Sequence, residues 1–207
     1  MANFKEPTPI ERDHDFLWRI HPHVPPKGWV AIFNRSHYED VLVTRVHKLI
    51  SKQTCTARYE SIRAFELGLQ ESGTTILKFF LHISKEEQLA RFGKRLDDPL
   101  RNWKISESDY SERLLWDDYM RAVEKALSAT STREAPWYVI PANHKWFRNL
   151  AISQIVADTM DDLGMSFPKP AVDLAGIRRK YHAAAEEERN GEGKQTGVRK
   201  KSVKRDD

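Results

Sequence analysis

The sequence contains one cysteine, no long apolar run and none of the short motifs that signal common metal or redox chemistry. Cys55 is alone among 207 residues, so no internal disulfide can form, which fits a reducing cytoplasm. No apolar run approaches the roughly 20 residues that span a bilayer, and the polar first residues do not resemble a signal peptide. There is no zinc or haem pattern, no G-x-S-x-G and no dinucleotide fingerprint. We therefore expect a cytoplasmic protein without a membrane partner.

Net charge is also absent from most of the chain. The sequence has 34 Lys and Arg against 30 Asp and Glu, and from Gly176 onward the count is 10 against 6. Residues 1–175 therefore hold 24 of each sign and are neutral overall. This part has no global field to attract polyanions, so any such affinity must come from local clusters. Binding of nucleic acid through the tail is the least favoured function considered, because the tail mixes both signs.

Three apolar segments of strand length predict a β-sheet. Each is rich in β-branched or aromatic residues, and the first is a continuous apolar run typical of a buried strand. The segments are Gly28–Phe33, Thr74–Ile83 and Trp137–Pro141. Helical segments separate them, and strands that alternate with helices favour a parallel sheet covered on both faces. The sequence therefore predicts an α/β fold.

Serine residues with a capping-box spacing, Ser-x-x-Glu or Ser-x-x-Asp, open three of the predicted helices. These serines are Ser36, Ser84 and Ser106. We expect helices at about 36–50, 56–70, 84–97, 106–130 and 144–164, the last ending at Gly164. Residues 181–207 contain almost no large apolar side chain and are predicted to be a disordered charged tail after a folded domain of residues 1–180.

The most informative segment is Ile32-Phe-Asn-Arg-Ser-His-Tyr-Glu-Asp-Val-Leu42. Its apolar strand ends at Asn34 and Arg35 and leads directly into a helix. Proteins of the α/β class place their chemistry at such carboxyl ends of parallel strands. Glu39 and Asp40 lie at the start of that helix, where their carboxylates could organise water or a metal ion. For Glu39, the capping box is an equally good explanation.

This segment and others in the same order resemble the polyphosphate kinase 2 family, whose members move phosphoryl groups between inorganic polyphosphate and nucleotides. The resemblance implies a three-layer parallel-sheet core similar to that of phosphate-loop kinases, with a helical lid at about residues 84–130. The similar blocks are Phe4–Thr8, His14–Arg19, Ile32–Leu42, Gln88–Pro99, Trp103–Lys104, Leu115–Tyr119, Ser128–Thr132, Ala135–Pro141 and His144–Trp146.

The resemblance also implies roles for individual residues. Phosphoryl transfer needs in-line positioning and cations directed at the transferred group, and the planar fork of arginine binds phosphate oxygens in pairs. A surface or helical arginine is the alternative at Arg35 and Arg19. The implied roles are catalysis by Arg35, orientation by Asn34, binding of polyphosphate or nucleotide by Arg19, Arg91, Arg95 and Lys104, and binding of Mg²⁺ by Asp40 and Glu39.

One feature of the family is missing from the sequence. Members carry the phosphate loop G-x-D-x-x-G-K upstream of the strand, and residues 1–27 contain no such loop. The loop supplies backbone amides, a lysine and an aspartate that helps to hold magnesium. We therefore expect an amino-terminally truncated core, without the first strand and the phosphate loop, that is inactive by itself.

Two functions stay open at this point. The first is a polyphosphate-dependent nucleotide kinase by family, acting between polyphosphate and a nucleoside mono- or diphosphate. The second is a non-catalytic protein that binds polyphosphate or a full-length partner. A homo-oligomer is compatible with both.

Overall fold

The computed structural model describes residues 1–201, with side-chain surroundings given for residues 1–189. Within this range, short parallel strands alternate with helices, which confirms the predicted α/β class. The chain divides into two compact units, Met1–Thr159 and a second that begins at Met160. Every predicted site residue lies in the first unit. None of the described helices is long and apolar enough to cross a membrane.

The described strands form two separate pairs. Strand β1 (Ala2–Asn3) pairs in parallel with β2 (Phe33–Asn34). Strand β3 (Lys78–His82) pairs in parallel with β4 (Trp137–Pro141), so that the first residues of both strands lie opposite each other. The carboxyl ends of β3 and β4 therefore meet at one edge. Both of these strands lie within segments that the sequence predicts as strands.

The predicted buried strand at residues 28–33 is wrong in extent and in burial. Only Phe33 belongs to β2, and Trp29, Val30 and Ile32 have exposed fractions of 74%, 80% and 62%. The physical reason is that β2 pairs with β1 alone among the strands of residues 1–201. An apolar run indicates a buried strand only when neighbouring elements cover it.

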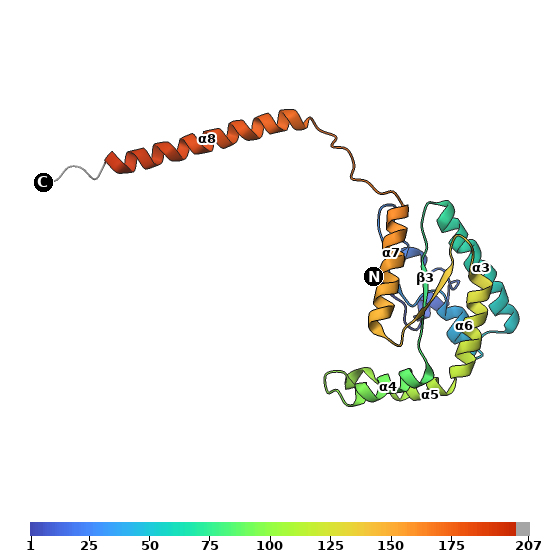
Figure 1. The fold of residues 1–207 in the computed structure, drawn as a ribbon. Helices are drawn as coiled ribbons and strands as arrows, with labels where there is room; N and C mark the ends of the chain where they lie inside the picture. Colours follow the sequence, from blue (N-terminus) through green and yellow to red (C-terminus); the bar gives the residue numbers. More distant parts are fainter. Residues whose placement is uncertain (202–207) are drawn as a thin grey trace. The chain divides into compact units, whose positions relative to one another are not determined.

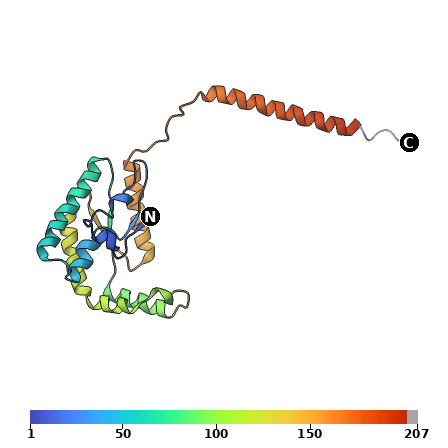
Figure 2. The same cartoon turned by 180° about the vertical axis from the view of Figure 1, so that it is seen from behind.

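Helices pack on both sides of the β3–β4 pair. Figure 1 shows α7 on one side of β3 and α3 and α6 on the other, and Figure 2 shows the same order from behind. Helices α4 and α5 lie side by side beyond the carboxyl end of β3 (Figure 1). The helices of residues 1–162 are α1 Pro9–Arg12, α2 Glu39–Val46, α3 Lys52–Glu71, α4 Lys85–Leu96, α5 Glu107–Leu114, α6 Trp116–Thr130 and α7 Lys145–Asp162, with 3-10 turns η1 His21–His23 and η2 Asn102–Lys104.

Two of the three predicted capping boxes behave as N-caps. The hydroxyl of Ser84 accepts the backbone N–H of Glu87 at 3.1 Å, and Ser106 forms the full reciprocal box. Ser36 does not cap a helix, because its hydroxyl accepts the N–H of Tyr38 at 3.3 Å and α2 begins three residues later. The predicted helix at 106–130 is instead two helices, α5 and α6, which meet at Leu115.

A buried cluster holds α2, α3 and α6 together. It consists of Tyr38, Val41, Cys55, Tyr59, Ile62 and Ala126, and each has an exposed fraction of 5% or less. Burial of large apolar side chains contributes about 1.5–3 kcal/mol each. This cluster therefore fixes α2 and the turn that precedes it, which is where the predicted catalytic residues lie. Cys55 has a packing role in it.

The second unit contains helix α8 (Leu174–Lys201), whereas the sequence predicts disorder from residue 181. Alanine, glutamate, lysine and arginine favour a helix even when no apolar face is buried, and this composition accounts for the difference. Leu174, Ile177 and Tyr181 have exposed fractions of 51% to 68%. The part of the predicted tail at residues 202–207 lies outside the described residues. A domain boundary near residue 180 stays a prediction.

Candidate phosphate-binding site

The turn between β2 and α2 holds Arg35 in an unusual backbone conformation. Its φ is 60°, in the left-handed region that non-glycine residues rarely adopt. Such a conformation costs about 1–3 kcal/mol and is found most often at functional sites, where the surrounding structure holds it in place. The side chain is exposed at the carboxyl end of β2. Asn34, the last residue of β2, is also exposed, and its carbonyl accepts the N–H of Phe4 at 3.2 Å.

Two carboxylates follow Arg35 in the first turn of α2. Burial raises the pKa of Glu39, and the positive charge of Arg35 opposes this rise. Burial likewise raises the pKa of Asp40, and Arg58, which lies 3.8 Å from that carboxylate, opposes it. The two side chains are thus partly desolvated and share their surroundings with arginines. They can accept hydrogen bonds or coordinate a cation.

Residues 1–189, whose side-chain surroundings the structure describes, contain no group of three or more acidic, histidine or cysteine side chains arranged to hold a metal ion. This is compatible with Mg²⁺, which is usually bound through one or two protein carboxylates together with water and substrate phosphates. The raised pKa values of Glu39 and Asp40 fit that chemistry, because a cation beside them would favour their ionised forms.

Arg19 is buried, with an exposed fraction of 6%, so it is not a solvated helical arginine. Its guanidinium donates to the carbonyl of Lys5 at 2.8 Å and lies 3.6 Å from the carboxylate of Glu11. Burial raises the pKa of Glu39 and Asp40, and the positive charge of Arg19 is one of the influences that oppose this rise in both. The charge of Arg19 therefore acts on the carboxylates that follow Arg35.

Arg91 fastens α4 to the carboxyl end of β4. Its guanidinium donates to the carboxylate of Glu87 at 2.8 Å and to the carbonyls of Ala142 at 2.6 Å and Asn143 at 3.3 Å. The side chain of Asn143 in turn accepts the N–H of Ser84 at 2.9 Å. Arg91 therefore lies at the sheet edge where the sequence predicts phosphate binding, but most of its donors are engaged within the chain.

Arg95 lies in α4 and Lys104 in η2, within the segment that projects beyond the carboxyl end of β3. Among the described residues, neither side chain has hydrogen bonds like those that fasten Arg91 to Ala142 and Asn143. The guanidinium of Arg95 is 5.8 Å from the ring centre of Phe92, and the ammonium of Lys104 is 5.0 Å from that of Trp103. Within the part of the chain that the structure describes, no carboxylate lies within ion-pair distance of either residue. Their charges are available to an anionic ligand.

A polar contact joins α5 and α6 to the carboxyl-terminal end of α2. Glu112 lies 3.0 Å from His47 and accepts the hydroxyl of Tyr119 at 2.6 Å. Burial and the Glu112 hydrogen bond raise the pKa of Tyr119, with a smaller increase from Glu39 and a decrease from Arg35. Arg35 and Glu39 are thus near enough to Tyr119 to influence it electrostatically. Residue spacing alone does not predict this contact.

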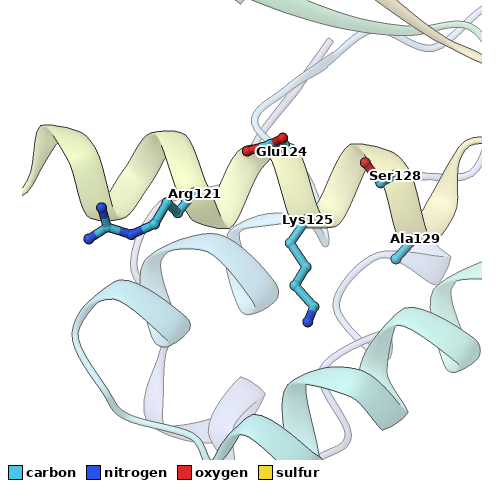
Figure 3. Close-up of a pocket in the computed structure, with 5 residues that line it drawn as sticks. All are labelled: Arg121, Glu124, Lys125, Ser128 and Ala129. Atoms are coloured by element: carbon cyan, nitrogen blue, oxygen red, sulfur yellow. The ribbon is translucent and has the colours of Figure 1, made fainter.

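An open depression of about 490 Å³ on α6 does not coincide with these residues. Figure 3 shows Arg121 and Lys125 extending from the helix, with Glu124, Ser128 and Ala129 along the same stretch. None of the residues predicted to bind phosphate lines it. The candidate site is therefore defined by the polar turn and the strand ends and not by this hollow.

The chain is similar to known proteins over most of its length. The sequence profile described as "Polyphosphate kinase 2 (PPK2)" matches residues 1–168, which is most of the chain. The chain belongs to the polyphosphate kinase 2 family. A solved structure, polyphosphate kinase 2 from Arthrobacter aurescens TC1, superposes with a TM-score of 0.86 at 47% sequence identity. That superposition covers 88% of this chain and 64% of the other.

Two curated relatives with polyphosphate phosphotransferase names are longer than this chain. The AMP/ADP-polyphosphate phosphotransferase of Meiothermus ruber is 53% identical over 170 residues, which are 82% of this chain and 64% of the relative. The ADP-polyphosphate phosphotransferase of Rhodopseudomonas palustris is 47% identical over 179 residues, 81% of this chain and 62% of the relative. The chain thus spans less than two thirds of the length of these relatives.

A buried polar network beneath the Arg35 turn is absent from the sequence predictions. It consists of His37, Tyr38, Glu66, Lys78 and Thr130. Two signals could have revealed it. Lys78 is the one charged residue in the apolar part of its strand, and Glu66 falls on the same helical face as the buried residues of α3. A charge in either position predicts a buried partner.

Proposed function

We propose that this chain carries the polyphosphate and nucleotide site of a phosphotransferase that acts between inorganic polyphosphate and a nucleoside mono- or diphosphate. The observation that carries the proposal is the turn after β2, where Arg35 has a left-handed backbone and is followed at once by two partly buried carboxylates. The names of the relatives from Meiothermus ruber and Rhodopseudomonas palustris describe the same class of reaction.

In this proposal, Arg35 stabilises the charge on the transferred phosphoryl group, and Asn34 orients the phosphate chain. Catalysis of phosphoryl transfer is almost entirely positioning and electrostatic stabilisation, which suits an arginine fixed by its backbone. Arg19 would support the same group from within the core. Mg²⁺ would be held by Glu39 and Asp40 and would neutralise phosphate charge when bound.

The projecting segment that contains α4 and α5 is proposed to act as the lid of a phosphate-loop kinase-like core. Arg91 would anchor it at the carboxyl end of β4, while Arg95 and Lys104 would contact the polyphosphate chain. The supporting observation is that Arg91 is tied to Ala142, whereas the cations of Arg95 and Lys104 lie near the rings of Phe92 and Trp103.

Replacing both Arg95 and Lys104 by Ala is expected to weaken the binding of long-chain polyphosphate and to flatten its salt dependence. Each lost phosphate contact should reduce the slope of log K against log salt by about 1, because fewer counterions are released. Titration calorimetry of the 207-residue chain over a series of salt concentrations measures this slope. Arg91 stays unchanged in the variant because its removal would also loosen α4.

The matched control is Arg121→Ala with Lys125→Ala, which removes the same charge from the exposed face of α6. Its slope should equal that of the parent chain. The control variant and the variant without Arg95 and Lys104 could also reduce the slope equally. Polyphosphate binding would then depend only on the overall charge of the chain, and the proposed lid contacts would be wrong.

A further inference from the structure

Four polar side chains from three elements meet in a buried network beneath the Arg35 turn. Glu66 of α3 accepts a hydrogen bond from the hydroxyl of Tyr38 at 2.8 Å and one from the ammonium of Lys78 at 2.7 Å. A ring nitrogen of His37 lies 3.4 Å from the same carboxylate. All four residues have exposed fractions of 7% or less. The two residues that precede α2 are thus bonded directly to a buried ion pair.

Hydrogen bonds outweigh the effect of burial on the pKa of Glu66, but not on the pKa of Lys78. Burial acts to raise the pKa of Glu66, but hydrogen bonds from His37 and Lys78 outweigh it, and the pKa is lowered. Burial lowers the pKa of Lys78, and Glu66 opposes this decrease. Buried ions persist only when their remaining hydrogen-bonding capacity is satisfied. This requirement fixes where Tyr38 and His37 can lie.

Lys78 also extends the network to the end of α6. Its ammonium donates to the carbonyl of Thr130 at 2.8 Å and lies 3.3 Å from the hydroxyl of Tyr38, so that its three donors all have partners. The hydroxyl of Thr130 accepts the indole N–H of Trp137 at 3.0 Å. The turn after β2 is therefore tied to α3, β3 and the last residue of α6.

Few side-chain interactions hold this turn locally. Helix α2 has no side-chain N-cap, and Ser36 accepts the N–H of Tyr38 at 3.3 Å through its hydroxyl and the N–H of Glu39 at 3.1 Å through its carbonyl. Strand β2 is two residues long. Besides the pairing of β2 with β1, the left-handed conformation of Arg35 is held by contacts on its carboxyl-terminal side, where the two residues after Ser36 belong to the buried network.

We propose that Glu66 and Lys78, acting through Tyr38 and His37, are positioning residues that hold Arg35 where it meets polyphosphate. They do not touch the ligand themselves. The inference rests on the proposed function of Arg35 and extends it, because it assigns the geometry of the phosphate-binding turn to an ion pair on other elements. A change in the network should therefore alter ligand binding only when Arg35 is present.

A double-mutant cycle with Tyr38→Phe and Arg35→Ala tests this dependence. Tyr38→Phe removes one hydrogen bond to Glu66 and leaves the ion pair in place, so the variant should fold. Affinity of the 207-residue chain for long-chain polyphosphate is measured by calorimetry and stability by thermal melting. We expect Tyr38→Phe to weaken binding at least threefold in the parent chain and to have no effect in the Arg35→Ala background, since coupled residues are non-additive.

Tyr59→Phe is the control, because Tyr59 is a buried tyrosine of the same apolar cluster and lies outside the network. It should leave the affinity unchanged even if its melting temperature falls as much as that of Tyr38→Phe. If Tyr38→Phe weakens binding equally in both backgrounds, or not at all, while Arg35→Ala does weaken it, the positioning role is wrong and the proposed function stands. If Arg35→Ala itself leaves binding unchanged, Arg35 does not contact the bound polyphosphate and the positioning role is wrong, whereas its role in the transition state is tested separately by kcat.

Discussion

Arg35→Lys is expected to lower kcat at least about tenfold, which corresponds to roughly 1.4 kcal/mol of transition-state stabilisation. The measurement requires a chimera in which the amino-terminal segment of the Meiothermus ruber relative, where the family is expected to carry its phosphate loop, precedes this chain. Lysine keeps the charge but loses the fork that binds two phosphate oxygens. KM for polyphosphate should change less than kcat, as expected for an interaction formed mainly in the transition state.

Lys48→Arg is the matched control for this substitution. Lys48 is exposed, has a similar left-handed backbone with a φ of 57°, and lies just beyond the other end of α2. The control therefore exchanges the same two cations in the same conformation but away from the strand end, and kcat should not change. If Arg35→Lys also has the kcat of the parent chimera, Arg35 is only a surface residue, and the phosphate role passes to the lid arginines.

Lys78→Met is expected to reduce the free energy of unfolding by about 3–5 kcal/mol, because it leaves the buried carboxylate of Glu66 without its cation. Urea denaturation of the 207-residue chain at pH 7 measures the loss. The folded pKa of Glu66 is lowered from its ordinary 4.5, so its contribution is present above that value and disappears as the pH falls through the folded pKa. At pH 7 the full effect is observed.

Two further variants distinguish the effect of losing the ion pair from the effect of changing the lysine side chain itself. Lys78→Met combined with Glu66→Gln removes both charges and should recover part of the lost stability. Lys125→Met makes the same substitution on the exposed face of α6 and should change the free energy of unfolding by less than about 0.5 kcal/mol. A loss in Lys78→Met no larger than in Lys125→Met would mean that the Glu66–Lys78 pair does not stabilise the fold.

Local sequence patterns correctly predicted the strands and helices that are packed against neighbouring elements. The segments around β3 and β4 combine apolar β-branched and aromatic residues, and Ser84 and Ser106 cap their helices as the spacing indicates. The segment at 28–33 has an equally apolar sequence but remains largely exposed. The difference lies in the neighbouring elements, because burial is a property of tertiary structure that a local run cannot encode.

The candidate site was predictable as a set of residue types but not as an arrangement. The polar turn at Asn34 and Arg35 is predictable from its place after an apolar strand. By contrast, the buried position of Arg19 and the tie between Arg91 and Ala142 depend on contacts between residues 14 and 51 positions apart. The Glu66–Lys78 pair was predictable in part. A charged residue on a buried face indicates that it has a buried partner, but the sequence does not identify that partner.

The central claim is the proposal that this chain carries a polyphosphate and nucleotide site that works when a phosphate loop precedes it. The most direct test is polyphosphate-dependent phosphorylation of AMP and ADP by the chimera and by the 207-residue chain, measured side by side. We expect turnover by the chimera and less than about 1 s⁻¹, the low end of ordinary enzyme rates, by the chain alone. A folded chimera without activity, under conditions in which the Meiothermus ruber relative is active, would contradict the account, and so would turnover at or above that rate by the chain alone.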